Sequence, residues 1–132
     1  MDLLMIIACV FLAGMVTGLI VSLKLRDLQE ADGQLPNIAP VGGGFGGITY
    51  ECAMIFMVWE LYQQYADKDV IEEYYGSMSR WLTCMHEKGM PGKIFVGPLG
   101  DWLAPDETDD YLMWNAFYYR CAYLLARMAQ II

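Results

Sequence analysis

The chain has 132 residues, of which 57% are hydrophobic and 18% charged, so it has room for one domain and too much apolar content for a disordered segment. Its formal net charge of −8 argues against a surface for nucleic acid or anionic membranes, because either surface would need clustered Lys and Arg. Four scattered cysteines without a C-x-x-C pair, together with a single histidine, do not support a zinc site. We expect the cysteines to be buried free thiols.

The first predicted element is an apolar run from Leu3 to Leu23 that contains no charged residue. The run is long enough to cross a hydrocarbon core of about 30 Å, which predicts a transmembrane helix. No positive charge precedes it, whereas a cleavable signal peptide would carry one. Lys24 and Arg26 follow the run and, by the positive-inside rule, would keep the rest of the chain cytoplasmic. The apolar run has two other interpretations. It could be a fully buried barrel helix of a cytoplasmic or secreted protein, or it could consist of residues that do not belong to the native fold.

A flexible segment follows the first helix. Pro36 and Pro40 favour extended backbone, and five glycines fall between Gly42 and Gly47. No Gly-Lys-Ser/Thr follows these glycines, so they do not indicate a phosphate-binding loop. We expect a mobile loop beside a ligand pocket.

Apolar residues at helical spacing predict two helices, over residues 50–66 and 69–89, that form an αα-hairpin. An apolar connection punctuated by glycines leads to a last helix over residues 107–131. With a first helix over residues 3–29, the chain is predicted to be all-α, with four principal helices. Each of the last three helices carries one tryptophan on its apolar face, predicted to be core: Trp59, Trp81 and Trp114.

Polar side chains at the predicted helix ends suggest how the helices begin and end. Asp69 can cap the second hairpin helix, with Glu72 completing a capping box. Thr108 is a plausible cap for the last helix. His86 is predicted to be a solvated cation at the C-terminus of its helix.

Four blocks of sequence, in order along the chain, carry a family resemblance. They are LRDLQ and DGQLPNIAP within 25–40, WELYQQYAD at 59–67 with VIEEYY and RWL within 70–82, GDWLAP at 100–105, and NAFYYR and LARMA within 115–129. Together, over residues 24–132, they resemble the helical-barrel catalytic domain of bacterial α-L-rhamnosidases. These enzymes are glycoside hydrolases of the family 78 type.

The resemblance implies both a fold and a reaction. The fold would be a fragment of an (α/α)6 six-hairpin toroid over residues 24–132, preceded by the hydrophobic segment 1–23. The reaction would be hydrolysis of terminal α-L-rhamnose with inversion, by one general-acid and one general-base carboxyl group. The implied partner is a rhamnose-containing oligosaccharide or glycoside, and no cofactor or metal is expected.

The chain departs from the family pattern where the catalytic residues would stand. The family signature Asp-Glu-Arg-x-Gly-Trp-x-Gly-Asp, which carries the general acid, does not occur in the sequence. The general base belongs to a part of the family domain that follows the matched stretch. We therefore assign no catalytic residue and expect the isolated chain to be inactive.

Four residues are predicted to bind substrate: Tyr50, Glu51, Asp101 and Trp102. Tyr50 and Glu51 lie in the stretch where the family has the motif Trp-Gly-Asp-Ala. This chain keeps a carboxylate there but lacks the tryptophan. By resemblance Trp102 lines the rhamnose pocket, since the C–H face of a sugar packs on an indole, and the two carboxylates contact sugar hydroxyls. Each residue also has a structural alternative. Trp102 could be a buried side chain that packs over the end of the hairpins, and Asp101 could be a turn residue. Glu51 could be a favourable charge in the first helical turn.

A second interpretation is a small membrane-anchored helical protein that acts as an interaction module without catalysis. Helices excised from a toroid lose the neighbours that bury their second face, so self-association is possible. Exposed apolar side chains are expected among five residues: Met54, Met57, Tyr75, Met78 and Tyr118.

Overall fold

The computed structural model describes residues 13, 16, 20, 24–36, 47–89, 105–106 and 108–132. The regular structure within these ranges is helical, without a strand, and confirms the all-α prediction. The elements are α2 (Ile48–Glu51), α3 (Ala53–Tyr65), α4 (Lys68–Lys88) and α5 (Asp110–Ile131), and residues 24–27 are also helical. The three predicted helices after the glycine-rich segment are thus confirmed, with ends within three residues of the expected ones.

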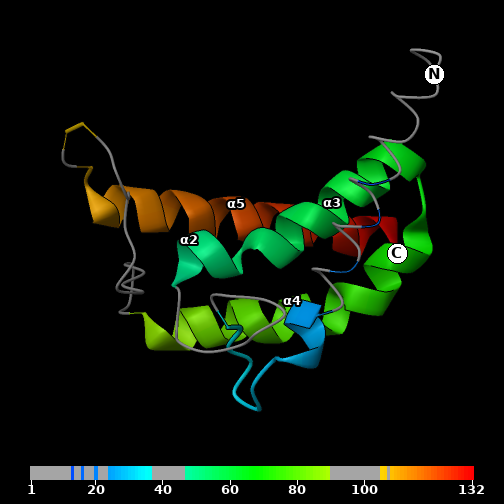
Figure 1. Ribbon diagram of the computed structural model, residues 1–132, viewed down its shortest axis with the longest axis horizontal. Helices are drawn as coiled ribbons and strands as arrows, with labels where there is room; N and C mark the ends of the chain where they lie inside the picture. The colour runs from blue at the N-terminus through cyan, green and yellow to red at the C-terminus, as the bar shows by residue number, and fades with distance from the viewer. Residues whose placement is uncertain are drawn as a thin grey trace.

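The helices form a small antiparallel arrangement in which every long helix packs on the other two. Figure 1 shows α3 and α5 running in the same direction, while α4 runs back against both. The predicted hairpin is therefore α3 followed by α4, with a tight turn at Ala66, whose backbone is left-handed at φ 52°. As a consequence, α2 and α5 begin at the same end of the molecule, which is also the end where α4 finishes (Figure 1).

Both predicted N-caps are displaced in the structure. Asp67, not Asp69, caps α4: its extended backbone lets the carboxylate accept a hydrogen bond from the Asp69 amide at 3.0 Å. Asp109, not Thr108, caps α5 and accepts from the Leu112 amide at 3.2 Å. Each observed cap lies within two residues of the expected one, because neighbouring polar residues compete for the same role.

The core lies where the three long helices meet, and α4 supplies its centre. Ile71, Tyr74, Met78, Trp81 and Met85 follow one another at helical spacing on α4 and are all fully buried. Each such side chain stabilises the fold by about 1.5–3 kcal/mol through removal of apolar surface from water. The other helices bury Trp114 but leave Trp59 half-exposed, so the tryptophan prediction is confirmed for two of three residues.

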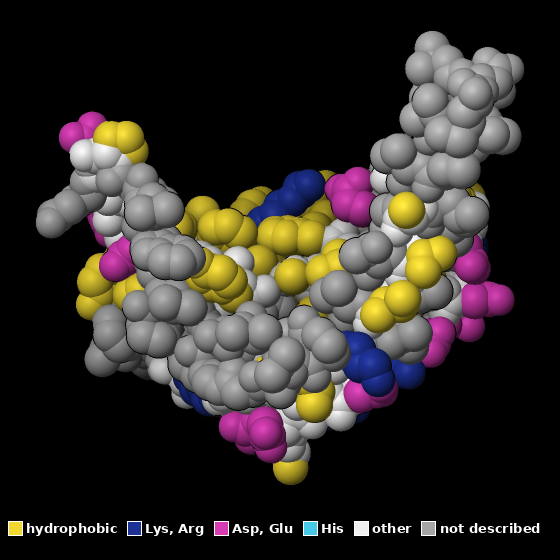
Figure 2. Space-filling view, viewed as in Figure 1, with side chains coloured by type: hydrophobic (Ala, Val, Ile, Leu, Met, Phe, Trp, Pro, Cys, Tyr) yellow, Lys and Arg dark blue, Asp and Glu magenta, His cyan; other side chains and the backbone are white. Residues whose placement is uncertain are grey.

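The prediction of exposed apolar residues named the wrong side chains. Met54 and Met78 are fully buried, and Met57, Tyr75 and Tyr118 are half-buried. Among the described residues, several of the exposed large apolar side chains lie instead on α5, where Leu112 and Tyr119 are 70% and 71% exposed. On the face drawn in Figure 2, hydrophobic side chains gather over α5. The reason is that α3 and α4 bury each other's apolar faces and one side of α5, which leaves the other side of α5 open.

The predicted transmembrane run, Leu3 to Leu23, lies outside the described residues except for Ala13, Val16 and Ile20, which are helical and exposed. Among the helices that the structure describes, none combines the length and the hydropathy needed to cross a membrane. The prediction for the run itself is therefore untested.

Candidate functional site

Two of the four predicted site residues, Tyr50 and Glu51, lie within the described residues. Tyr50 and Glu51 lie on α2, and α2 starts at the end where α5 also starts (Figure 1). Asp101 and Trp102 precede α5 in the sequence and lie outside the described residues. Tyr50 is 38% exposed, whereas Glu51 is fully buried. The two neighbours therefore differ sharply in their access to a ligand.

Glu51 holds two distant parts of the chain together. Its Oε2 accepts a hydrogen bond from the Trp81 indole Nε1 at 2.9 Å and another from the Leu35 amide at 3.3 Å. Trp81 is on α4, and Leu35, also fully buried, is in the segment that precedes the glycine-rich stretch. A buried carboxylate needs such donors, because leaving its oxygens unpaired away from water is costly. The interpretation of Glu51 as a helix-start charge misses this tertiary role.

The segment around Gln29 is fixed to α4 by a hydrogen-bond network. Gln29 Nε2 donates to the carbonyl oxygens of Gly33 and Ser77, both at 2.9 Å. Arg80 Nη2 donates to Gln29 Oε1 at 2.8 Å and to Ser77 Oγ at 3.1 Å. The LRDLQ block of the sequence therefore has a structural role, since its glutamine links residues 24–36 to α4.

Gly33 allows the same segment to approach α4 closely. Its φ is +95°, a conformation that side chains strongly disfavour. A Cβ at this position would lie 2.5 Å from the carbonyl oxygen of Arg80. Only glycine can therefore bring the chain against α4 here and deliver Leu35 to the Glu51 carboxylate.

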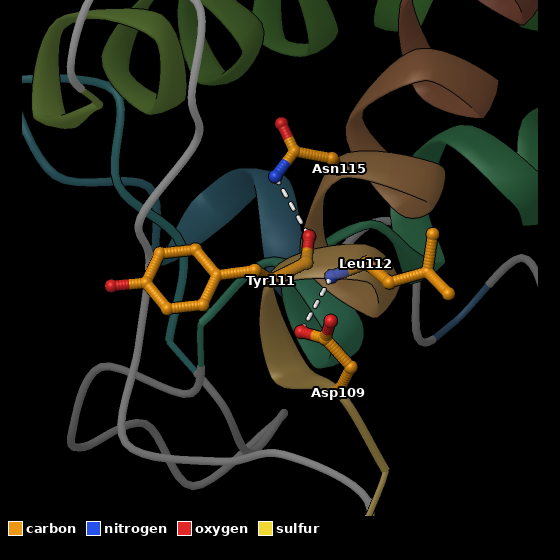
Figure 3. Close-up of a pocket in the computed structure, with 4 residues that line it drawn as sticks. All are labelled: Asp109, Tyr111, Leu112 and Asn115. Atoms are coloured by element: carbon orange, nitrogen blue, oxygen red, sulfur yellow. Dashed lines mark hydrogen bonds between the residues drawn. The ribbon is translucent and has the colours of Figure 1, made fainter.

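A pocket of about 360 Å³ opens at the start of α5, lined by Asp109, Tyr111, Leu112 and Asn115. Figure 3 shows the Tyr111 and Leu112 side chains pointing in opposite directions from the first turn of α5. Asp109 Oδ1 is used to cap the helix, and Asn115 Nδ2 donates to the Tyr111 carbonyl oxygen at 2.7 Å. An aromatic ring, a carboxylate and an amide in a space of this size suit a small polar ligand such as a sugar. None of these four residues was predicted to bind substrate, although Asn115 begins the NAFYYR block that carries part of the family resemblance.

A second pocket, of about 230 Å³, lies between α3 and α5 and is lined by Phe56, Ala116, Phe117 and Arg120. The rings of Phe56 and Phe117 are 6.1 Å apart. Its lining is apolar apart from the guanidinium group, so it offers little hydrogen bonding to a sugar.

His86 has a partner that the sequence did not suggest. It lies in the last turn of α4 and is exposed, as predicted, but its Nδ1 is 3.1 Å from the Tyr118 hydroxyl, and the two rings stack. Burial raises the pKa of Tyr118 above its ordinary value. Over the described residues, no group of three or more His, Cys, Asp and Glu side chains is arranged to hold a metal ion.

A family model described as the bacterial alpha-L-rhamnosidase 6 hairpin glycosidase domain matches residues 10–132. The chain belongs to this family. The match covers most of the chain and begins inside the apolar run, well before Lys24, where the sequence resemblance starts. The described helices are accordingly part of a six-hairpin toroid.

Individual rhamnosidases agree with this assignment. An alpha-L-rhamnosidase of Streptomyces avermitilis is 36% identical over 109 residues, which are 80% of this chain and 10% of that protein. An alpha-L-rhamnosidase of Alteromonas sp. is 27% identical over 124 residues, 80% of this chain and 13% of that protein. The chain thus spans about a tenth of the length of these rhamnosidases.

Two solved rhamnosidase structures share the fold. The crystal structure of Streptomyces avermitilis alpha-L-rhamnosidase complexed with L-rhamnose superposes with a TM-score of 0.76 and 31% identity, over 83% of this chain and 11% of that one. Alpha-L-rhamnosidase from Dictyoglumus thermophilum gives a TM-score of 0.77 at 24% identity, over 84% of this chain and 13% of that one, a likeness of fold.

Proposed function

We propose that this chain is one segment of an α-L-rhamnosidase catalytic domain and supplies part of the pocket wall for a terminal α-L-rhamnose. The observation that carries the proposal is the family match combined with the position of the site residues. Tyr50, Glu51 and the pocket around Tyr111 all belong to the end where α2 and α5 begin. The substrate class, a rhamnose-containing glycoside, follows from the family and from the rhamnosidase solved with L-rhamnose.

The proposed residues divide into two roles. Trp102 offers an indole to the C–H face of the sugar, and Asp101 and Tyr50 bind its hydroxyl groups. Glu51 is buried, and its Oε2 already accepts hydrogen bonds from the Trp81 indole and the Leu35 amide. These contacts favour a role in positioning α2 at the proposed pocket. The hydrogen bonds of Glu51 would hold α2 in place, and the fully buried carboxylate would not itself touch the sugar.

Turnover requires groups that we place outside residues 1–132. Inverting hydrolysis uses two carboxyl groups about 6.5–9.5 Å apart, one protonated, with a water molecule between the base and the sugar. General acid and base groups contribute roughly 10²–10⁴-fold each to the rate. Since the chain spans about a tenth of related rhamnosidases, we propose that other parts of the domain supply both groups. The isolated chain would then bind rhamnose weakly without hydrolysing a rhamnoside.

Binding and hydrolysis can be tested separately on the purified chain. Saturation-transfer NMR should detect L-rhamnose bound to the unmodified chain, and Trp102→Ala should remove the signal. Tyr119→Ala is the matched control, because Tyr119 is an exposed aromatic residue in the second half of α5. Equal loss in both variants, or no binding to the unmodified chain, would contradict the proposed pocket.

Hydrolysis is measured with an aryl α-L-rhamnoside. We expect no release of the aryl alcohol above background. Release that disappears in the Glu51→Gln, Asp101→Asn double variant would show that these two carboxyl groups suffice for catalysis, and the assignment of the acid and base to other segments would be wrong.

A further inference from the structure

One face of α5 carries a continuous stripe of exposed side chains. Its members are mostly apolar and follow one another at alternating spacings of four and three residues: Leu112, Ala116, Tyr119, Tyr123, Ala126 and Gln130. This spacing is the heptad pattern of a helix that pairs lengthwise with a second helix. The opposite face of α5 holds its buried residues and packs on α2, α3 and α4. The stripe is therefore a helix-pairing surface for which the described helices supply no partner.

The centre of the stripe is aromatic and has a hollow beside it. The rings of Tyr119 and Tyr123 stack with their centroids 6.5 Å apart, and Arg120 Cζ lies 5.7 Å from the centroid of the Tyr123 ring. These contacts hold the exposed rings in place before a partner binds, which lowers the entropy cost of association. The pocket of about 230 Å³ between α3 and α5 has Ala116 in its wall. A small residue beside an apolar hollow leaves room for one large side chain of a second helix.

The charges of α5 are separated along its length. Its start carries Asp109 and Asp110, and its second half carries Arg120 and Arg127. When two copies of α5 pair in opposite directions, the acidic start of each copy lies beside the basic half of the other. In a parallel pair each arginine would lie beside its own copy, and the like charges would repel. The charge pattern therefore makes this face complementary to itself in the antiparallel arrangement.

We propose that two copies of this chain form an antiparallel dimer through the α5 stripe, with Tyr119 of each copy opposite Ala116 of the other. In this register the Tyr119 ring enters the hollow beside Ala116, and Leu112 faces Tyr123. A two-fold axis relates the two halves of the contact, as it does wherever one surface binds its own copy. The dimer does not depend on the proposed binding of rhamnose, because Tyr111 points away from Leu112 and stays outside the interface (Figure 3).

The length of α5 sets the strength of the contact. Its 22 residues span about 33 Å. One pair of helices of this length makes an interface at the small end of the specific range, so we expect dissociation at micromolar concentrations. Tyrosine and arginine, which carry much of the binding energy in protein interfaces, lie at its centre as Tyr119 and Arg120.

Sedimentation velocity of the full chain at increasing concentration tests the dimer. We expect the mass to rise from the 15.0 kDa of one chain to twice that value. Tyr119→Glu should raise the dissociation constant at least about tenfold, because it places a charge at the centre of the interface. Tyr111→Glu is the matched control: it makes the same change on α5, outside the stripe, and should leave the dissociation constant unchanged. Both side chains are more than half exposed, so the far-ultraviolet circular dichroism of each variant should match that of the unmodified chain.

Arg127→Gln decides the direction of the two helices. In the antiparallel dimer it should raise the dissociation constant, because the acidic start of the partner helix loses its counter-charge, and added salt should weaken the unmodified dimer for the same reason. In a parallel pair the same variant would remove a repulsion and tighten the dimer. A monomer at every concentration would leave this face of α5 to other parts of the catalytic domain and overturn the proposal. A dimer that persists in Tyr119→Glu, or one that Arg127→Gln tightens, would also overturn it.

Discussion

The hydrogen bond between Trp81 and Glu51 should make a measurable contribution to the free energy of unfolding. Trp81→Phe removes the indole N–H that donates to Glu51 Oε2 at 2.9 Å and leaves the Leu35 amide, at 3.3 Å, as the remaining donor described for that oxygen. A hydrogen bond to a charged group contributes about 1.5–3 kcal/mol, and a buried acceptor that loses its donor bears the desolvation cost. We therefore expect a coupling energy of about 2 kcal/mol between the two side chains.

A double-mutant cycle isolates this energy from the loss of ring volume. Urea-induced unfolding, followed by far-ultraviolet circular dichroism, is measured for the unmodified chain, Trp81→Phe, Glu51→Gln and the double variant. Trp59→Phe is the control, since it makes the same change of ring on α3 away from this carboxylate. A coupling energy below about 0.5 kcal/mol would refute the view that Glu51 ties α2 to α4.

Three further predictions concern the packing around α4. Gly33→Ala should lower the free energy of unfolding by more than about 2 kcal/mol, because the added Cβ would lie 2.5 Å from a carbonyl oxygen of α4 and the φ is +95°. Gly76→Ala should raise the free energy of unfolding by about 0.5–1 kcal/mol, because the added Cβ would meet no atom closer than 3.8 Å. Both values are measured by urea-induced unfolding. Tyr74→Phe should cost less than about 0.5 kcal/mol, since among the described residues the buried Tyr74 hydroxyl has no hydrogen-bond partner, and a loss above 1 kcal/mol would reveal one. The backbone amide of Gln34, followed by the charge of a nearby lysine, lowers the pKa of Asp32 below its ordinary value, so its contribution to stability is present above the unfolded pKa and is lost as pH falls through the folded pKa. Asp32→Asn should therefore lower Tm at neutral pH and match the unmodified chain once the pH lies well below the folded pKa of Asp32; a difference that persists in strong acid would contradict this linkage.

The helices could be predicted from the sequence because their signal is local. On α4 the apolar residues Ile71, Tyr74, Met78 and Trp81 recur at helical spacing, and all four are buried. The family resemblance added the six-hairpin toroid, to which the described helices belong. The choice between capping residues could not be made in advance, because Asp67 and Asp69 are equally suited and only the backbone conformation at the turn selects one.

The contacts that build the site depend on long-range packing, which periodicity does not encode. Glu51 meets Trp81 across thirty positions in the sequence, and nothing local distinguishes a buried glutamate from an exposed one at a helix start. The burial of Met54 was missed for the same reason, since it depends on which neighbours the helix finds.

The central claim, that the end where α2 and α5 begin binds a terminal rhamnose, is tested most directly by mapping L-rhamnose onto the chain. Backbone amide shifts are followed by two-dimensional NMR during a titration with L-rhamnose. The account predicts that shifted amides cluster at Tyr50, Glu51, Asp109 and Tyr111, while the turn at Ala66, at the opposite end of α3, remains unchanged. Shifts centred on that turn, or no shifts at saturating sugar, would contradict it.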